Sequence, residues 1–386
     1  MAHMLRGKTA IVGAGHCRFG ALDGRSELEL LGEAVHAALA DAGISLQDVD
    51  GLFNASSGHW SSTMVVQEYL GLRPRFSCRN VIGGSSFESH VLTASMALEA
   101  GIIDTALICY AANPRTGNKG RLVSLSEMPT YEKGYRPRNP PNAYALAAAR
   151  HMHQYGTTVD QLAEIAVAAR AWAQKNPEAC TYGEGELTVE EVNSARMVVD
   201  PFTSRHCCLV VDGGGAIVMV RADRAKDFPK KPVYHLGTAP ATWHRQISEM
   251  PDLTVSAASE SGPRAFAMAG VTPADIDLVM LYDAFTICTL LFLEDLGFCR
   301  KGEGGAFVSD GNIAPGGALA VNTNGGGLSC VHPGMYGIFL LIEAVRQIRG
   351  ETGDRQLRKC DIAVAHGNGG TLSSQVTTVL GSAAAL

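Results

Sequence analysis

The chain has 386 residues, of which 46% are hydrophobic and 18% are charged, and its formal net charge is −6. That length favours two packed halves of about 150 residues or more over one simple core. The negative charge argues against a nucleic-acid binder or a polybasic membrane binder. The sequence contains no apolar run of about 18 residues, so no membrane-spanning helix is predicted.

The first predicted element is a buried strand, Thr9–Gly15, that ends in glycines. No glycine stands at position 18, so the Gly-x-Gly-x-x-Gly fingerprint is incomplete and a Rossmann enzyme is disfavoured. Ser26 followed by Glu29 is a capping-box pattern, which predicts that a helix begins here and runs to about Ala42. A short apolar strand ending near Asn54 follows it.

One segment of the chain recurs. Residues 42–50 read Ala-Gly-Ile-Ser-Leu-Gln-Asp-Val-Asp, and residues 269–277, which lie 227 positions later, read Ala-Gly-Val-Thr-Pro-Ala-Asp-Ile-Asp. Each copy follows a predicted helix and precedes a predicted strand, which in the second copy is Leu278–Leu281. The repeated order of helix, turn and strand indicates an internal duplication.

Two helix–strand pairs support the duplication: 86–100 with 105–111, and 334–349 with 361–365. We therefore predict two similar α/β halves, an N-terminal half 1–225 and a C-terminal half 226–386.

The N-terminal half contains a long insertion, roughly 113–200. It begins with Pro- and Arg-rich loops and continues as two predicted helices, Asn142–Gln154 and Val159–Lys175, the second capped by Thr158. Loops of this length inside a compact chain usually build a binding surface, so we expect the insertion to shape the substrate pocket.

The segment richest in chemistry is 322–337, Asn-Thr-Asn-Gly-Gly-Gly-Leu-Ser-Cys-Val-His-Pro-Gly-Met-Tyr-Gly. It joins a predicted strand, 318–321, to a predicted helix, 338–349. A glycine-rich turn lets backbone approach a ligand closely, and His332 can act as an acid, a base or a hydrogen-bond donor. The simpler alternative is a tight strand-to-helix turn with a solvated histidine.

This segment resembles the Gly-His-Pro loop of the thiolase superfamily, with Val331 in place of the glycine before His332. Three further segments resemble thiolase motifs in the same order: Asp212–Ala216, Tyr282–Phe285 and His366–Gly370. The resemblance covers nearly the whole chain and is closest to the sterol-carrier-protein-type thiolases and their lipid-transfer-protein aldolase relatives. It implies a fold of duplicated α/β halves in five layers (αβαβα), with a loop and helix insertion.

The chain departs from thiolases at the nucleophile. Thiolases place a cysteine at the start of a buried helix, and here Gly83 or Gly84 stands at that place, while Cys78 lies earlier on a strand. Ser85 or Ser86 is expected to cap this helix rather than to act as a nucleophile. Without a thiolate, the usual covalent acyl transfer has no nucleophile.

The remaining groups suit a retro-aldol cleavage of a β-hydroxyacyl-CoA, which needs no covalent intermediate. The resemblance implies that Tyr282 is the acid–base group and that His332 donates a hydrogen bond to the thioester oxygen. Tyr336 and His366 are candidates for a second phenol and a second base or donor. Cys330, two residues before His332, is either a relocated nucleophile or base, or a packing thiol.

We expect seven further residues to contact the substrate: Gly83, Gly84, Ser85, Asn324, Gly326, Asn368 and Gly369. Coenzyme A is expected as part of the substrate, with no other cofactor. Ten cysteines without a Cys-x-x-Cys pair indicate reduced thiols in the cytoplasm and no metal site. The resemblance implies a homodimer and allows a small zinc-ribbon/OB-fold partner subunit, whereas no nucleic-acid or membrane partner is expected.

The leading function is therefore an acyl-CoA carbon–carbon lyase that acts on a sterol side chain or an aromatic acyl chain. One alternative is a β-ketoacyl-CoA thiolase or acyltransferase with non-standard residues. Another is a non-catalytic thiolase-like subunit that binds acyl-CoA.

Overall fold

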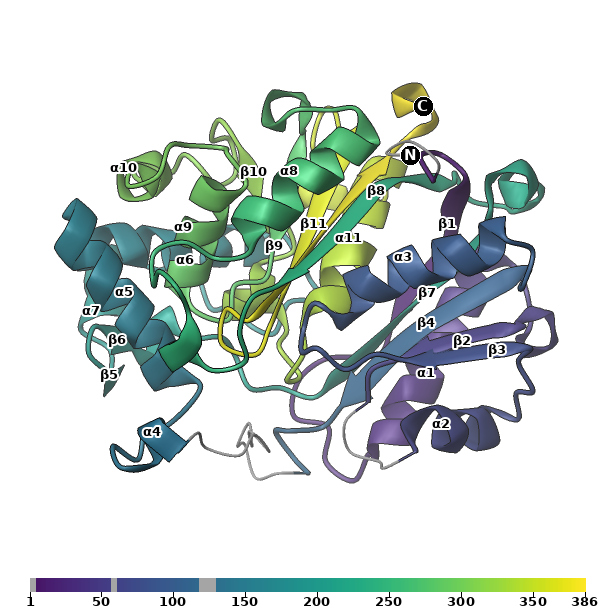
Figure 1. The fold of residues 1–386 in the computed structure, drawn as a ribbon, viewed down its shortest axis with the longest axis horizontal. Helices are drawn as coiled ribbons and strands as arrows, with labels where there is room; N and C mark the ends of the chain where they lie inside the picture. The colour runs from purple at the N-terminus through teal and green to yellow at the C-terminus, as the bar shows by residue number, and fades with distance from the viewer. Residues whose placement is uncertain (1–4, 57–60, 118–129) are drawn as a thin grey trace.

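The computed structural model describes residues 5–56, 61–117 and 130–386, and it is built on one ten-stranded mixed sheet (Figure 1). The strands of this sheet are β1 (Thr9–His16), β2 (Gly51–Asn54), β3 (Phe76–Arg79), β4 (Thr105–Ala112), β7 (Gly213–Arg221), β8 (Val233–Thr242), β9 (Leu278–Leu281), β10 (Ala320–Val321), β11 (Ile362–Gly369) and β12 (Ser374–Gly381). Their order is β10-β9-β11-β12-β8-β1-β7-β4-β2-β3.

The sheet consists of two equivalent halves. From the outer edge inward, β3-β2-β4-β7-β1 corresponds position by position to β10-β9-β11-β12-β8, and the parallel and antiparallel pairings correspond as well. The halves join where β1 pairs with β8, at Ala10 with Tyr234 and Ile11 with Val233. The strands that precede Asn54 and Tyr282 thus occupy the same position in their half-sheets, which confirms the duplication. The predicted boundary at 225/226 falls in the connection between β7 and β8.

Helices fill the space between the half-sheets and cover their outer faces. α3 (Ser86–Glu99) and α11 (Gly337–Arg349) pack on each other and on strands of both halves, and Figure 1 shows them at the centre of the molecule. α1 (Glu27–Ala42) packs on the outside of the N-terminal half-sheet, and α8 (Ala258–Ala269) packs on the outside of the C-terminal one. The layers therefore follow the predicted αβαβα order.

The duplicated turn has the same local chemistry in both halves. The Asp48 carboxylate accepts a hydrogen bond from the Ser45 amide, and the Asp275 carboxylate accepts one from the Thr272 amide, each at 2.8 Å. α1 begins with the predicted capping box, in which the Glu29 carboxylate accepts from the Ser26 amide at 2.7 Å. Equivalent caps fix equivalent entries into β2 and β9.

The insertion forms helices that pack against the C-terminal half. Its elements are α4 (Thr130–Lys133), α5 (Pro141–Tyr155), α6 (Val159–Ala173), α7 (Val189–Asn193) and the short hairpin strands β5 (Met197–Val199) and β6 (Phe202–Thr203). α5 and α6 contact α9 (Thr286–Asp295), and α6 also contacts α10 (Gly304–Val308), so the insertion lies beside the C-terminal half in Figure 1. Residues 118–129 of the predicted insertion lie outside the described residues.

Two local predictions hold only in part. Ser85 is the N-cap residue of α3, but its side chain makes no capping hydrogen bond, because its hydroxyl donates to the Ile82 carbonyl at 3.1 Å and the Ser86 hydroxyl donates to the Gly83 carbonyl at 2.6 Å. The strand predicted over 318–321 shortens to β10, because the Leu319 amide turns back to donate to the Asn312 carbonyl.

The ten cysteines are all free, and four of them, Cys17, Cys109, Cys288 and Cys330, are buried. Within the ranges that the structure describes, no helix combines the length and the apolar character needed to cross a bilayer.

Candidate active site

The site lies at the carboxyl ends of β9, β10 and β11, which are parallel neighbours. Parallel strands place the segments that follow them at one edge of the sheet, where α/β proteins usually bind ligands. Tyr282 directly follows β9, and its backbone amide donates to the His366 carbonyl at 3.1 Å. His332 lies on the loop between β10 and α11, and its Nε2 is 3.0 Å from the Tyr282 hydroxyl.

Tyr282 and His332 are both buried and both uncharged at neutral pH. Burial lowers the pKa of His332 to about 4 and raises the pKa of Tyr282 well above its usual value. The 3.0 Å contact to Nε2 is shorter than the 3.4 Å contact of the same hydroxyl to the Gly334 carbonyl, so we assign the phenol proton to the bond with His332. His332 then carries its own proton on Nδ1, a buried nitrogen without a partner among the described residues.

Tyr336 completes a cluster of three aromatic side chains. Its ring centroid lies 5.8 Å from that of Tyr282 and 6.5 Å from that of His332. Its hydroxyl donates to Asn324 Oδ1 at 2.8 Å, and the Gly326 amide donates to the same oxygen at 2.9 Å. The Asn324 side-chain oxygen therefore connects the backbone of the loop, at Gly326, to the Tyr336 hydroxyl.

The loop before His332 is fixed to the end of β9 by two side chains. Asn322 accepts from the Leu281 amide at 2.7 Å and donates to the Leu281 carbonyl at 3.0 Å. Asp283 accepts from the Gly327 amide at 2.6 Å, and burial raises the pKa of its carboxyl group to about 7. A side chain at Gly326, which has φ +67°, would overlap the Asp283 carboxylate, so this glycine permits the approach of Asp283.

The insertion holds the same loop from the other side. The Cys180 amide donates to the Cys330 carbonyl at 3.0 Å, and the Thr181 hydroxyl donates to the Ser329 carbonyl at 2.9 Å. These carbonyls belong to the π-helical turn Gly326–Cys330, a feature that the sequence pattern did not predict. The turn is therefore fixed from both sides ahead of His332.

The ring of Tyr282 lies against Gly84, one of the two glycines, Gly83 and Gly84, that stand where thiolases have their cysteine. A Cβ atom built on Gly84 would lie 2.5 Å from the Tyr282 Cζ and would overlap Cε2. The same atom would lie 2.7 Å from the Asn368 carbonyl oxygen. A side chain at position 84 and a tyrosine at 282 cannot both adopt this arrangement, so the Tyr282 ring requires a glycine here.

Gly83, Gly369 and Ser85 pack around this position. A Cβ on Gly83 would lie 2.5 Å from the Gly369 Cα, so the turn before α3 rests directly on the end of β11. The Ser85 hydroxyl lies 3.0 Å from the Ser374 hydroxyl and 3.1 Å from the Ile82 carbonyl. Neither group is a base, so nothing in these contacts activates Ser85 as a nucleophile.

The side chain of His366 is occupied by residues of β12. Nε2 lies 2.9 Å from Gln375 Oε1, and Nδ1 lies 2.9 Å from the Thr377 hydroxyl. Gln375 in turn donates to Asn368 Oδ1, and Asn368 donates to the Tyr144 hydroxyl, each at 2.8 Å. Both ring nitrogens of His366 are therefore occupied, so neither is free to act as the expected second base or donor. The amide oxygen and nitrogen of Asn368 are both used in the same chain of hydrogen bonds.

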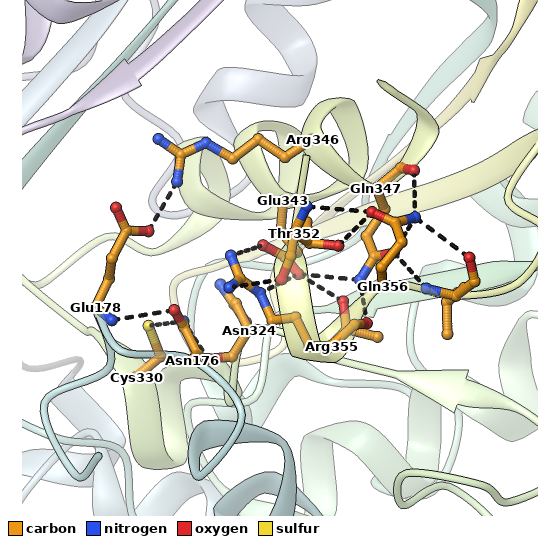
Figure 2. Close-up of polar contacts among 12 residues, drawn as sticks. Asn176, Glu178, Asn324, Cys330, Glu343, Arg346, Gln347, Thr352, Arg355 and Gln356 are labelled. Carbon is orange, nitrogen blue, oxygen red and sulfur yellow. Dashed lines mark hydrogen bonds and ion pairs between the residues drawn. The ribbon is translucent and has the colours of Figure 1, made fainter. Parts of the chain in front are cut away.

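Cys330 is the last residue of the π-helical turn, and its side chain contacts Asn176 of the insertion. Asn176 Nδ2 is 3.6 Å from its sulfur, and Figure 2 shows the two residues side by side. The thiol borders a cavity of about 20 Å³ that Glu343 and Arg355 also line. Burial raises the pKa of Cys330 well above its usual value, whereas a nucleophilic cysteine needs a lowered pKa.

Three polar side chains near the site were not predicted as site residues: Glu88, Tyr144 and Asp283. Glu88, in the first turn of α3, is fully buried, and neither carboxyl oxygen has a partner among the described residues. Side chains at Gly337 and Gly367 would collide with its carboxyl group, so Glu88 lies between the starts of α3 and α11 and the end of β11. A glutamate within an apolar helix is the signal that could have identified it.

Where the structure describes the chain, no three His, Cys, Asp or Glu side chains are grouped so that they could hold a metal ion.

Comparisons with known proteins agree with this geometry. The family described as Thiolase C-terminal domain-like matches residues 239–382. A relative from Thermomonospora curvata, named steroid side-chain-cleaving aldolase, is 35% identical over 95% of this chain and 96% of its own length. The chain belongs to the thiolase superfamily. Its place is in the sterol-carrier-protein-type branch that includes aldolases, as the resemblance of its motifs predicted.

Two further members of the superfamily are similar over nearly their whole length. A Mycobacterium tuberculosis protein named 17-hydroxy-3-oxo-4-pregnene-20-carboxyl-CoA lyase is 36% identical over 90% of this chain and 93% of its own length. A solved structure described as the Ltp2-ChsH2(DUF35) aldolase matches with a TM-score of 0.88 at 33% identity, covering 98% of this chain and 99% of that chain.

The steric exclusion at Gly84 can be tested by a double-mutant cycle. Gly84→Ala should destabilise the protein by about 1–3 kcal/mol, because the new methyl group overlaps the Tyr282 ring. In a Tyr282→Ala background the ring is absent, and the loss of stability caused by Gly84→Ala should be smaller by about 1 kcal/mol or more. The loss that remains comes from the contact of the new methyl group with the Asn368 carbonyl oxygen. Denaturant unfolding of the four proteins measures both costs. Tyr282→Phe, which keeps the ring, is the control and should preserve the full cost; equal costs in all backgrounds would refute the exclusion.

Glu88 predicts a pH-dependent stability. Burial raises the pKa of Glu88 well above its usual 4.5, so the folded protein keeps a proton that the unfolded chain releases. The stability that this proton contributes is complete below the unfolded pKa and is lost as pH rises through the folded pKa. Relative to the parent, Glu88→Gln should therefore gain Tm as the pH rises above the usual carboxyl pKa of 4.5. Glu99→Gln, at an exposed position on the same helix, is the control and should give a flat difference; a flat difference for Glu88→Gln as well would refute the assignment.

Proposed function

We propose that this protein is a lyase that cleaves a carbon–carbon bond of a β-hydroxyacyl-CoA by a retro-aldol reaction. Coenzyme A enters as part of the substrate, and the proposal needs no other cofactor. The observation that carries it is Tyr282, whose ring leaves no room for a side chain at Gly84 and whose hydroxyl contacts His332. This arrangement supplies proton transfer where a thiolase supplies a covalent acyl acceptor.

In the proposed reaction, protons pass along the pair of Tyr282 and His332. The Tyr282 oxygen takes the proton of the β-hydroxyl group as its own proton passes to His332 Nε2, 3.0 Å away. The β-carbon becomes a carbonyl group, the bond between the α- and β-carbons breaks, and its electrons form an enolate. His332 Nδ1–H donates to the enolate oxygen, and the positive charge that His332 acquires stabilises the anion. The proton then returns through Tyr282 to the α-carbon, and the enzyme recovers its starting state.

The neutral resting states of both groups suit this relay. A phenol with a raised pKa is a poor base alone, but transfer of its own proton to a neighbouring imidazole removes the need for a free phenolate. Burial of the pair excludes water and strengthens its interaction with the developing charge. Tyr336 packs against both rings and adds a second phenol beside the reacting groups.

The alternatives find less support in the site. A thiolase or acyltransferase needs a nucleophile at the start of α3, where a side chain on Gly83 would collide with Gly369 and one on Gly84 would collide with the Tyr282 ring. Cys330 has a raised pKa and contacts Asn176, which makes it unsuitable as a relocated nucleophile. A non-catalytic acyl-CoA-binding subunit would not need a buried phenol hydrogen-bonded to an imidazole.

The acyl group and the assembly are parts of the same proposal. The named activities of the two relatives support a steroid side chain, or a chain of similar bulk, as the acyl group. A homodimer is supported by β3, an edge strand that pairs only with β2 among the described strands and is followed by the exposed Val81. The two-component name of the aldolase structure supports a partner subunit, and we propose for it the small zinc-ribbon/OB-fold protein that the family resemblance implies. We place the assembly in the cytoplasm, since all ten cysteines are free thiols.

Product analysis tests the proposal. The protein, with and without a candidate partner, is incubated with a panel of β-hydroxyacyl- and β-ketoacyl-CoA esters and analysed by mass spectrometry. We expect an aldehyde or ketone together with a shortened acyl-CoA from a β-hydroxy ester, without consumption of free CoA and without an acyl adduct on the protein. Cleavage of β-keto esters that consumes free CoA would instead establish a thiolase.

A further inference from the structure

The loop that carries His332 is closed by contacts between its own two ends. Thr323 and Asn324 are consecutive residues at the start of the loop. Tyr336 ends the loop, and Glu343 lies seven residues later on α11. The Thr323 hydroxyl donates to Glu343 Oε1 at 2.7 Å, and the Tyr336 hydroxyl donates to Asn324 Oδ1 at 2.8 Å. Seven residues are about two helical turns, so Tyr336 and Glu343 face the same side. We call these two contacts the loop clamp.

Glu343 is held in place by a buried ion pair. Arg355 donates from Nε to Glu343 Oε1 at 3.0 Å and from Nη2 to Oε2 at 3.1 Å. Both side chains are almost fully buried, and Figure 2 shows them facing each other. Gln347, one turn further along α11, donates to the Arg355 carbonyl at 2.9 Å. The bidentate geometry leaves Glu343 one orientation, in which one of its oxygens meets Thr323.

The segment between the clamped ends contains three consecutive glycines and is held by several other elements. Besides Asp283 and the insertion, the Leu209 amide donates to the Gly327 carbonyl at 2.9 Å and the Tyr110 hydroxyl donates to the Pro333 carbonyl at 2.8 Å, but these contacts do not fix the distance between Thr323 and α11. Tyr336, at the start of α11, packs against Tyr282 and His332, so a shift of α11 relative to Thr323 changes the distance between the reacting groups. Buried ion pairs contribute little net stability compared with apolar residues of similar size, which favours a geometric role.

We propose that Glu343, oriented by Arg355, is a positioning residue that holds Tyr336 and the His332 loop against Tyr282 through Thr323. This inference rests on the proposed lyase function. Glu343 itself touches neither Tyr282 nor His332 in any hydrogen bond of the structure, so it acts through Thr323 and α11.

Thr323→Val tests the clamp, because it removes one hydroxyl group and keeps the shape of the side chain. With the β-hydroxyacyl-CoA ester that the parent cleaves, we expect kcat to fall by about tenfold or more, since small displacements of reacting groups are costly, and KM to change by less than about twofold. Amide hydrogen exchange measured by mass spectrometry should increase in the peptide that spans residues 322–336.

Thr352→Val is the matched control. Thr352 is buried in the same polar cluster, and its hydroxyl donates to Gln356 at 2.6 Å, away from the loop. It should lower Tm about as much as Thr323→Val and leave kcat and the exchange of residues 322–336 unchanged. Equal kcat values and equal exchange in the two variants would overturn the clamp. If the parent cleaves no ester of the panel, the lyase function fails, and the exchange experiment still decides on the clamp.

Discussion

The approach of the Tyr282 ring to the α-carbon of Gly84 is the constraint on which the rest of the site depends. A thiolase uses the start of the central helix to present a thiol, and here neither Gly83 nor Gly84 has room for a side chain. The helix start remains, but its neighbour is a phenol bonded to His332. The start of the central helix thus lies beside a phenol–imidazole pair that is suited to proton transfer.

Burial then sets the charge state of the groups around this contact. Tyr282, His332 and Glu88 all have pKa values shifted toward their neutral forms by the loss of water. A neutral site can bind an uncharged thioester carbonyl and develops charge only as the carbon–carbon bond breaks. Charge that develops beside buried, fixed hydrogen-bond donors is stabilised more strongly than it would be in water.

Much of this could be predicted from the sequence because it depends on local pattern. The duplicated turn, the capping box at Ser26 and the motif order identify the halves and the family. The contact of Gly84 with Tyr282 joins residues about 200 positions apart, and no spacing rule reveals it. The sequence also could not predict that the His366 ring nitrogens contact Gln375 and Thr377, because these residues lie on the next strand. A sequence motif names a residue type but not the direction in which its side chain points.

The central claim is that the Tyr282 hydroxyl carries the proton transfer, and Tyr282→Phe tests it most directly. The variant keeps the ring against Gly84 and removes one hydroxyl group. We predict that kcat falls by about 10²–10⁴-fold, with KM nearly unchanged and a loss of about 1 kcal/mol of stability. Steady-state kinetics on the cleaved ester, together with the Tm of both proteins, gives the answer. Full turnover in a mildly destabilised variant would contradict the account.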